Sequence, residues 1–133
     1  MSEAKKLLYL AGPMRGIPQY NFPAFDEMRD LVNATEGYEA ISPADLDRKR
    51  GHDPARLPED HDWSSFDGMG AALSEDVAVI ARCDGLLVLD GWERSTGTAA
   101  EILCAFALRK FIYRFRDGRI QRATLVQPKI RIL

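Results

Sequence analysis

The hydrophobic pattern alternates between short apolar runs and longer segments whose apolar residues recur at helical spacing. Leu86–Leu89 is apolar without alternation, as expected for a strand buried on both faces of a parallel sheet. Further strands are predicted at Leu7–Ala11, Tyr38–Ile41 and Phe111–Phe115. Three helices are predicted from helical spacing of apolar residues. The first follows Asn21 and ends at Gly37, and its apolar face carries Phe25, Met28, Leu31 and Val32. The second covers 70–82 with Leu73, Val77 and Ile80 inward, and the third follows Ser95, with apolar residues clustered at Ile102, Ala105, Phe106 and Ala107.

This regular alternation of strands and helices predicts an α/β fold. We expect a Rossmann-like or flavodoxin-like three-layer sandwich, with a mostly parallel sheet, right-handed crossovers and helices on both faces. Asp117-Gly118 lies between two apolar runs and predicts a C-terminal β-hairpin, which would extend the sheet or contribute to a dimer interface. With 133 residues, 46% of them hydrophobic, the chain has room for a single domain, residues 1–133.

A long polar segment from Ala44 to about Gly68 interrupts the pattern. Loops of this length are usually functional lids or disordered, and this one follows a strand where a lid would close over a substrate, with Trp63 and Phe66 anchoring its far end. The pairs His52-Asp53 and His61-Asp62 suggest a metal site as an alternative, but they lack a spacing that would converge on one ion, and we expect no metal. Arg48-Lys49-Arg50 is most simply a solvated charge run, although it could attract a phosphate.

The segment Asp90–Glu101 is the strongest candidate for chemistry, because it follows a buried strand and opens a helix. Ligands of open α/β sheets bind outside the carboxyl ends of the strands. We expect Glu101 near the helix N-terminus, ionised at neutral pH, with the backbone of Ser95 and Gly97 able to hold a phosphate. The alternative is that Glu101 only complements the helix dipole.

A second loop, Gly12-Pro13-Met14-Arg15-Gly16, follows the first predicted strand. Its glycines would allow close approach of the backbone to a ligand, and the Arg15 guanidinium offers donors for a phosphate or a carboxylate.

Together the two loops resemble the nucleoside 2-deoxyribosyltransferase superfamily, which includes the 2'-deoxynucleoside 5'-monophosphate N-hydrolases. The resemblance rests on Tyr9-Leu-Ala-Gly-Pro-Met-Arg-Gly16, on Ser95-x-Gly97-x-x-x-Glu101 and on Asp76 between them. Small phage and bacterial domains of unassigned function within that superfamily share the Gly-Pro-Met-Arg-Gly and Gly-Trp-Glu-x-Ser-x-Gly patterns. The resemblance covers most of residues 7–112.

The resemblance implies a role for each matching residue. Glu101 would be the nucleophile that attacks the anomeric carbon, and the Tyr9 hydroxyl would orient it. Asp76 would contact the sugar hydroxyls or help to protonate the departing base, with its neighbour Glu75 as the alternative. The positions of Arg15, Gly16 and Ser95 would bind a 5'-phosphate, although Pro13 stands where the hydrolases have a serine.

Other residues of these loops are candidates for substrate contact. Trp92 could stack on a nucleobase, or it could pack over the edge of the sheet. Asp90 could bind a sugar hydroxyl or cap the next turn. Gly12, Met14 and Gly97 complete the predicted substrate-binding set.

Charge and composition limit the kinds of molecule that the protein is expected to bind. The 18 basic and 20 acidic residues give a net charge of −2, so we expect a free nucleoside or nucleoside monophosphate and no long nucleic acid. No run approaches membrane-spanning length, and the two cysteines, Cys83 and Cys104, fit a reducing cytoplasm. We expect no cofactor. The resemblance implies a homodimer or larger homo-oligomer, since that superfamily usually completes its pocket with a residue from a neighbouring subunit.

The leading hypothesis is therefore an N-glycosidase that cleaves a (deoxy)nucleoside 5'-monophosphate through a covalent glycosyl-glutamate intermediate. Deoxyribosyl transfer between bases would use the same intermediate. A nucleotide-binding sensor would need the loops but would tolerate loss of Glu101, and a structural or interaction module would need neither. The base, the sugar, the acceptor and a phage or host setting are open at this point.

Overall fold

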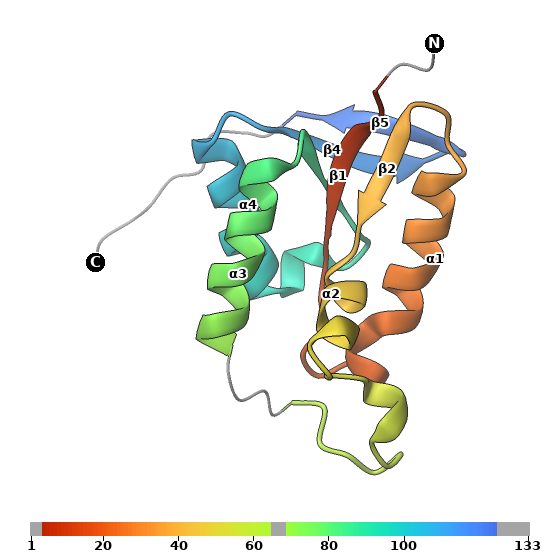
Figure 1. Ribbon diagram of the computed structural model, residues 1–133, viewed down its shortest axis with the longest axis vertical. Helices are drawn as coiled ribbons and strands as arrows, with labels where there is room; N and C mark the ends of the chain where they lie inside the picture. Colours follow the sequence, from red (N-terminus) through yellow and green to blue (C-terminus); the bar gives the residue numbers. More distant parts are fainter. Residues whose placement is uncertain (1–3, 65–68, 125–133) are drawn as a thin grey trace.

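The computed structural model describes residues 4–64 and 69–124, without the side chains of 69–71, and has a five-stranded sheet at its centre (Figure 1). The strand order is β2-β1-β3-β4-β5, in which the first four strands are parallel and β5 is antiparallel to β4. The α/β prediction with a mostly parallel sheet and a C-terminal hairpin is confirmed. The strands are β1 (Lys6–Ala11), β2 (Tyr38–Ile41), β3 (Gly85–Val88), β4 (Phe111–Arg116) and β5 (Arg119–Ala123).

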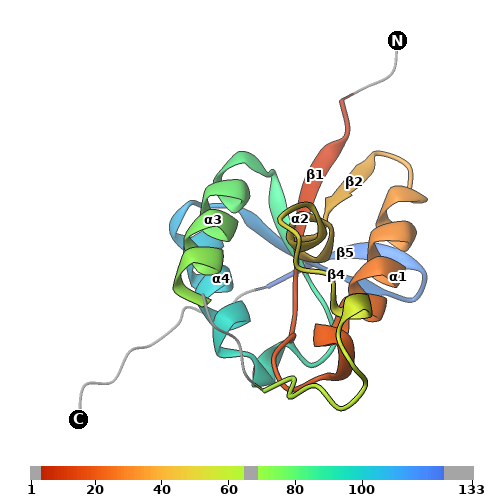
Figure 2. The same ribbon diagram turned by 60° about the horizontal axis from the view of Figure 1, so that its bottom comes forward.

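Helices cover both faces of the sheet and make the three layers (Figures 1 and 2). One face carries α1, the opposite face carries α3 and α4, and the short α2 follows β2. The helices are α1 (Phe22–Asn33), α2 (Pro43–Lys49), α3 (Met69–Arg82) and α4 (Thr96–Ala107), with 3₁₀ turns η1 (Pro18–Asn21), η2 (Pro54–Arg56) and η3 (Trp92–Arg94).

Side-chain alternation in β1 divides the core into two clusters. Leu8 and Leu10 point toward α1, where they pack with Phe25. Tyr9 and Ala11 point toward α3 and α4 and belong to the other cluster. Because successive strand residues face opposite sides of a sheet, the position of Tyr9 in β1 places its phenol beneath α3 and α4.

The segment after β2 differs from the structureless lid expected from its polarity. Ser42 and Pro43 do not merely stop β2, because they also start α2: Ser42 Oγ accepts the N–H of Ala44 at 3.2 Å, and Pro43 occupies the first turn. The turn η2 follows at Pro54. Phe66, one of the two expected anchors, lies outside the described residues.

Four details of the predicted helices are wrong. The first helix ends at Asn33 rather than Gly37, which instead adopts a left-handed φ of 88° just before β2. Leu31 and Phe106 were expected on buried faces, but they are 38% and 40% exposed. The apolar arc of α4 is wider than its contact with the sheet, which buries Ile102 and Ala105 and leaves Phe106 and the exposed Ala107 outside.

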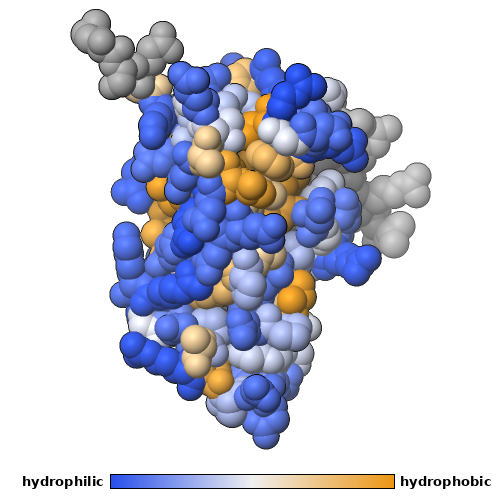
Figure 3. All heavy atoms as spheres, turned by 90° about the vertical axis from the view of Figure 1, so that its right-hand side faces the viewer, coloured by the Kyte–Doolittle hydropathy of each residue, from blue (hydrophilic) through white to orange (hydrophobic). Residues whose placement is uncertain are grey.

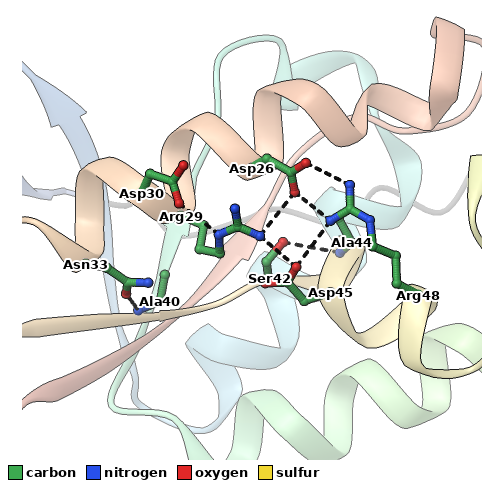
Figure 4. Close-up of polar contacts among 9 residues, drawn as sticks. All are labelled: Asp26, Arg29, Asp30, Asn33, Ala40, Ser42, Ala44, Asp45 and Arg48. Carbon is green, nitrogen blue, oxygen red and sulfur yellow. Dashed lines mark hydrogen bonds and ion pairs between the residues drawn. The ribbon is translucent and has the colours of Figure 1, made fainter. Parts of the chain in front are cut away.

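An ion-pair network ties α2 to the outer surface of α1 (Figure 4). Arg48 donates to both carboxylate oxygens of Asp26, at 2.7 Å each, and Arg29 donates to Asp45 at 2.7 Å. Hydrophilic side chains predominate on this side of the molecule, with apolar ones gathered in small patches between them (Figure 3). The network joins α2 to α1 through partly exposed side chains.

Within residues 4–64 and 69–124, every helix is too short or too polar to cross a membrane.

Candidate active site

The topology of the sheet places the two candidate loops next to each other. The chain leaves β1 toward one neighbour, β2, and later returns to the other side of β1 as β3, so the strand order reverses between β1 and β3. Such a switch point is the usual ligand site of an open α/β sheet. The loop 12–16 follows β1 and the loop 89–95 follows β3, and both line a cleft of about 1330 Å³. The segment after α2 lies across the same end of the molecule (Figure 2).

Tyr9, Asp76 and Glu101 converge beside this cleft from three different elements. Tyr9 is fully buried in β1, Asp76 is half-buried in α3, and Glu101 is 8% exposed in α4. Burial is the main cause that raises the pKa of Tyr9 well above its usual value. The phenol also interacts electrostatically with the carboxyl groups of Glu101 and Asp76, and both raise its pKa further. The structure thus brings together all three residues that were predicted to be catalytic.

Glu101 lies deeper in α4 than the sequence suggested. The helix begins at Thr96, so Glu101 is in the second turn, and no acidic residue occupies the first turn. The helix dipole acts mainly within the terminal turn, which removes the explanation that Glu101 only complements it.

The expectation that Glu101 is ionised at neutral pH is also wrong for the free protein. Burial is the main cause that raises its pKa to about 8; the Tyr9 hydroxyl opposes this rise, and the neighbouring Asp76 adds to it. Such a carboxyl group, buried beside another acid at the edge of a cleft, is typical of a functional site.

Asp76 is the more acidic of the two carboxyl groups. Burial is the main cause that raises its pKa to about 6, and Asp47 adds to the effect, whereas Arg50 and Tyr9 oppose it. The Tyr9 hydroxyl and Asp76 Oδ1 are both buried, and neither forms a hydrogen bond with any described residue. Buried polar atoms without such a bond are costly, and Asp76, which lines the cleft, is available to a substrate.

The loop after β1 uses its glycines differently from the prediction. A Cβ at Gly12 would lie 2.8 Å from the Leu89 Cβ, so Gly12 permits close packing of the two loops rather than approach of a ligand. Gly16 has a φ of 82°, and its N–H already donates to the Trp63 carbonyl at 2.7 Å. In this conformation, the Gly16 N–H is therefore not free for a phosphate. Met14 and the exposed Arg15 both line the cleft.

The N-terminus of α4 offers a better anion site. Ser95 Oγ caps the helix by accepting the N–H of Thr98 at 3.1 Å and lies 3.0 Å from Thr98 Oγ1. Within the described residues, the N–H groups of Thr96 and Gly97 donate no hydrogen bond, and both residues line the cleft. Free N–H groups at a helix N-terminus favour an anion. Ser95 and Gly97 thus line the cleft, and their binding of a phosphate stays a prediction.

Asp90 lines the main cleft, but Trp92 does not. Trp92 packs against the core beneath α3 and α4 and lines a separate cavity of about 160 Å³, so the structure favours packing over stacking on a base. Asp90 lines the main cleft, and in the described part of the chain its side chain makes no capping hydrogen bond. Contact of Asp90 with a sugar hydroxyl stays a prediction.

Sequence reasoning missed the wall of the cleft that faces these loops. Gln19, Tyr20 and Asn21 all have positive φ angles, of 55°, 50° and 63°, and such strain in non-glycine residues is typical of functional sites. The Tyr20 hydroxyl lies 3.0 Å from His61 Nε2, and Asn21 donates to the Pro13 carbonyl at 2.9 Å. Only an Asn after an aromatic residue marks this turn in the sequence, which is too common a pattern to predict it.

The histidines of this wall do not form a metal centre with their neighbours. Among the residues that the structure describes, no three His, Cys, Asp or Glu side chains gather in a way that could hold an ion. Asp53 instead caps η2 by accepting the N–H of Ala55 at 3.0 Å, and Asp62 accepts the N–H of Ser64 at 3.0 Å.

With this geometry established, comparison with known proteins places the chain in a family. Residues 6–114 match the family described as a domain of unknown function, DUF4406. The chain belongs to the DUF4406 family. The DUF4406 match contains both cleft loops and all three converging residues, and it ends within β4, so β5 lies outside it. A search of curated proteins found no match.

Proposed function

We propose that this DUF4406 domain is an N-glycosidase that cleaves the bond between base and sugar of a (deoxy)nucleoside 5'-monophosphate. The observation that carries the proposal is the buried set of Tyr9, Asp76 and Glu101 beside the cleft. Glycoside hydrolysis commonly uses two carboxyl groups, one as nucleophile and one as acid. The motif resemblance supports the same roles, and we infer from it that the domain is related to the nucleoside 2-deoxyribosyltransferases.

The proposed phosphate site is the N-terminus of α4. The free N–H groups of Thr96 and Gly97, together with the Ser95 hydroxyl, would bind the phosphate oxygens. Arg15 lies on the opposite loop and forms no ion pair with the other described residues, so its guanidinium is available to the same anion. These contacts would fix the sugar beside Glu101, which is one turn farther along the helix.

In the first step, a carboxylate oxygen of Glu101 attacks the anomeric carbon and forms a glycosyl ester. The bond between this carbon and the base nitrogen breaks, and its electron pair leaves with the base. Asp76 gives its proton to the base, so that the base departs neutral. In the second step, water attacks the same carbon and the ester bond breaks. The proton of the water returns to Asp76, which restores both groups.

The first step requires an ionised Glu101 and a protonated Asp76. With pKa values of about 8 and about 6, the free protein at pH 7 holds its proton on Glu101 instead. Moving this proton to Asp76 produces the required state without exchange with solvent, and the Tyr9 hydroxyl is the group that interacts electrostatically with both carboxyl groups. The difference of about two pH units corresponds to about 3 kcal/mol. The positive charge that develops on the sugar stabilises an ionised Glu101 and offsets this cost.

We also propose that the protein forms a homodimer or a larger homo-oligomer. Large apolar side chains are exposed along and after α4, among them Leu103, Phe106, Leu108 and Phe111, at 40% to 49% of their surface. Such a patch favours a protein contact. Sedimentation equilibrium would show a dimer or larger species, whereas a monomer at micromolar concentration would contradict this part of the proposal.

The function is tested by incubating the purified protein with ribo- and deoxyribonucleosides and their 5'-monophosphates, with and without a free acceptor base. Released base is followed by chromatography. We expect release from a monophosphate in water and none from Glu101→Gln. Product formed only with an acceptor would identify a transferase, and binding without turnover would identify a sensor. Turnover by Glu101→Gln would remove Glu101 as the nucleophile.

A further inference from the structure

Arg50 binds acidic side chains from two helices, immediately beside the proposed site. It follows the last residue of α2, where its Nη1 donates to Asp47 Oδ1 at 3.0 Å. Its Nε lies 2.7 Å from Glu75 Oε2 on α3, and its Nη2 lies 3.8 Å from Asp76 Oδ1. The guanidinium thus uses three different nitrogens for three carboxylates, and it lines the cleft.

The surroundings of Asp76 explain why a cation is needed at this place. Its carboxyl group faces Tyr9 from β1, Glu101 from α4, Asp47 from α2 and Glu75 from its own helix. All four are neutral or negative, and Arg50 is the cation that acts on Asp76 among the described residues. Without Arg50, the carboxylates of Asp47, Glu75 and Asp76 would repel one another across the gap between α2 and α3.

We propose that Arg50 is a positioning residue that holds the Asp76 carboxyl group toward Tyr9 and Glu101 by joining α2 to α3 through Asp47 and Glu75. This inference rests on the proposed function of Asp76 and deepens it. The distance of 3.8 Å between Arg50 Nη2 and Asp76 Oδ1 is an ion pair that is too long for a hydrogen bond. Arg50 therefore orients Asp76 without occupying the oxygen that must exchange a proton.

Arg48 is a matched control in the same segment. It is two residues away, similarly exposed, and also bound to two carboxylates, Asp26 and Asp45. These partners lie on the outer side, between α1 and α2, and Arg48 does not line the cleft (Figure 4). Removing the Arg48 charge thus tests the loss of an ion-pair network that does not reach Asp76.

The experiment compares the wild type with Arg50→Met, Arg50→Lys and Arg48→Met. The pKa of Asp76 is measured by NMR on protein labelled with ¹³C at the aspartate carboxyl carbons, and its signal is assigned with Asp76→Asn. The pH dependence of kcat and KM is measured on the same proteins with the monophosphate that is cleaved. Circular dichroism confirms that each variant is folded.

We expect Arg50→Met to raise the pKa of Asp76 by roughly one pH unit, because the neighbouring positive charge is lost. Turnover should fall about tenfold or more in kcat with little change in KM, since misplacement of a proton donor affects the transition state. Arg50→Lys should restore most of the titration but less of kcat, because one ammonium group does not span three carboxylates. Arg48→Met should match the wild type in both readouts.

An Asp76 titration that is the same in Arg50→Met and in Arg48→Met would overturn the proposal, and so would equal losses of kcat in these two variants. If Arg50→Met does not fold, Arg50→Lys and Glu75→Gln provide the same comparison with smaller perturbations. A wild type that cleaves no nucleotide would refute the proposed function, while the NMR titration would still decide whether Arg50 controls Asp76.

Discussion

The buried Glu101 carboxyl group should make the folded protein less stable as the pH rises, and Glu101→Gln should remove this effect. In the unfolded chain the carboxyl group titrates near its ordinary pKa of 4.5, whereas in the folded protein its pKa is about 8. Between these values, the folded protein keeps a proton that the unfolded chain has lost. Raising the pH therefore favours unfolding across this range, and the loss of stability is complete above pH 8.

The size of the effect follows from the difference between the two pKa values. About 3.5 pH units separate 8 from 4.5, and each unit corresponds to about 1.4 kcal/mol, which gives about 5 kcal/mol at most. Water that enters the open cleft solvates the charge and lowers this value, so we expect about 3 kcal/mol. That is a large part of the stability of a small domain. A neutral glutamine has no such dependence.

Urea unfolding of the wild type and of Glu101→Gln at intervals from pH 4 to pH 9 measures this difference. The two proteins should have similar free energies of unfolding near pH 4, and the variant should be more stable by about 3 kcal/mol above pH 8. Glu93→Gln, an exposed residue of η3, is the control and should follow the wild type throughout. Parallel pH profiles for wild type and Glu101→Gln would refute the conclusion that Glu101 is held in its protonated form.

Three further predictions follow from the site and its loops. Base release should have a bell-shaped dependence on pH with flanks near 6 and 8, set by Asp76 and Glu101, and Asp76→Asn should abolish that shape in steady-state assays. Tyr9→Phe removes a buried hydroxyl without a hydrogen bond, so the free energy of unfolding in urea should stay the same or rise by about 1 kcal/mol. The same variant should lower kcat, and a clear loss of stability would contradict this prediction. Gly12→Ala should destabilise the protein by about 1 to 3 kcal/mol, since its new methyl group would meet Leu89 Cβ at 2.8 Å, and an unchanged thermal midpoint would argue against that contact.

Much of the fold could be predicted because its signals are local. Apolar runs such as Leu86–Leu89 indicated the buried strands, and Asp117-Gly118 indicated the hairpin, whose turn residues have positive φ angles of 54° and 71°. The helix α2 was missed because it has only seven residues, and because Ser42-Pro43 is as typical of the end of a strand as of the start of a helix.

The sequence motifs predicted which residues form the candidate site, but not their protonation states or their ion pairs. Tyr9 and Glu101 were named from motifs, whereas the protonation of Glu101 depends on its burial in the folded protein, which no local pattern specifies. Likewise, the Gly16 N–H was expected to be free, but it is bound by Trp63, a residue 47 positions away in the sequence. Arg50 looked like part of a solvated charge run, because its carboxylate partners on α3 are brought to it only by the tertiary fold.

Trapping the intermediate tests the central claim most directly. The protein is mixed with the monophosphate that it cleaves, quenched in acid during turnover, digested with a protease and examined by mass spectrometry. We predict that the peptide containing Glu101 carries the mass of the sugar phosphate without its base, and that Glu101→Gln carries no such addition. Base release by the wild type with the addition on Asp76, or with none on any peptide, would contradict the assignment of Glu101 as the nucleophile.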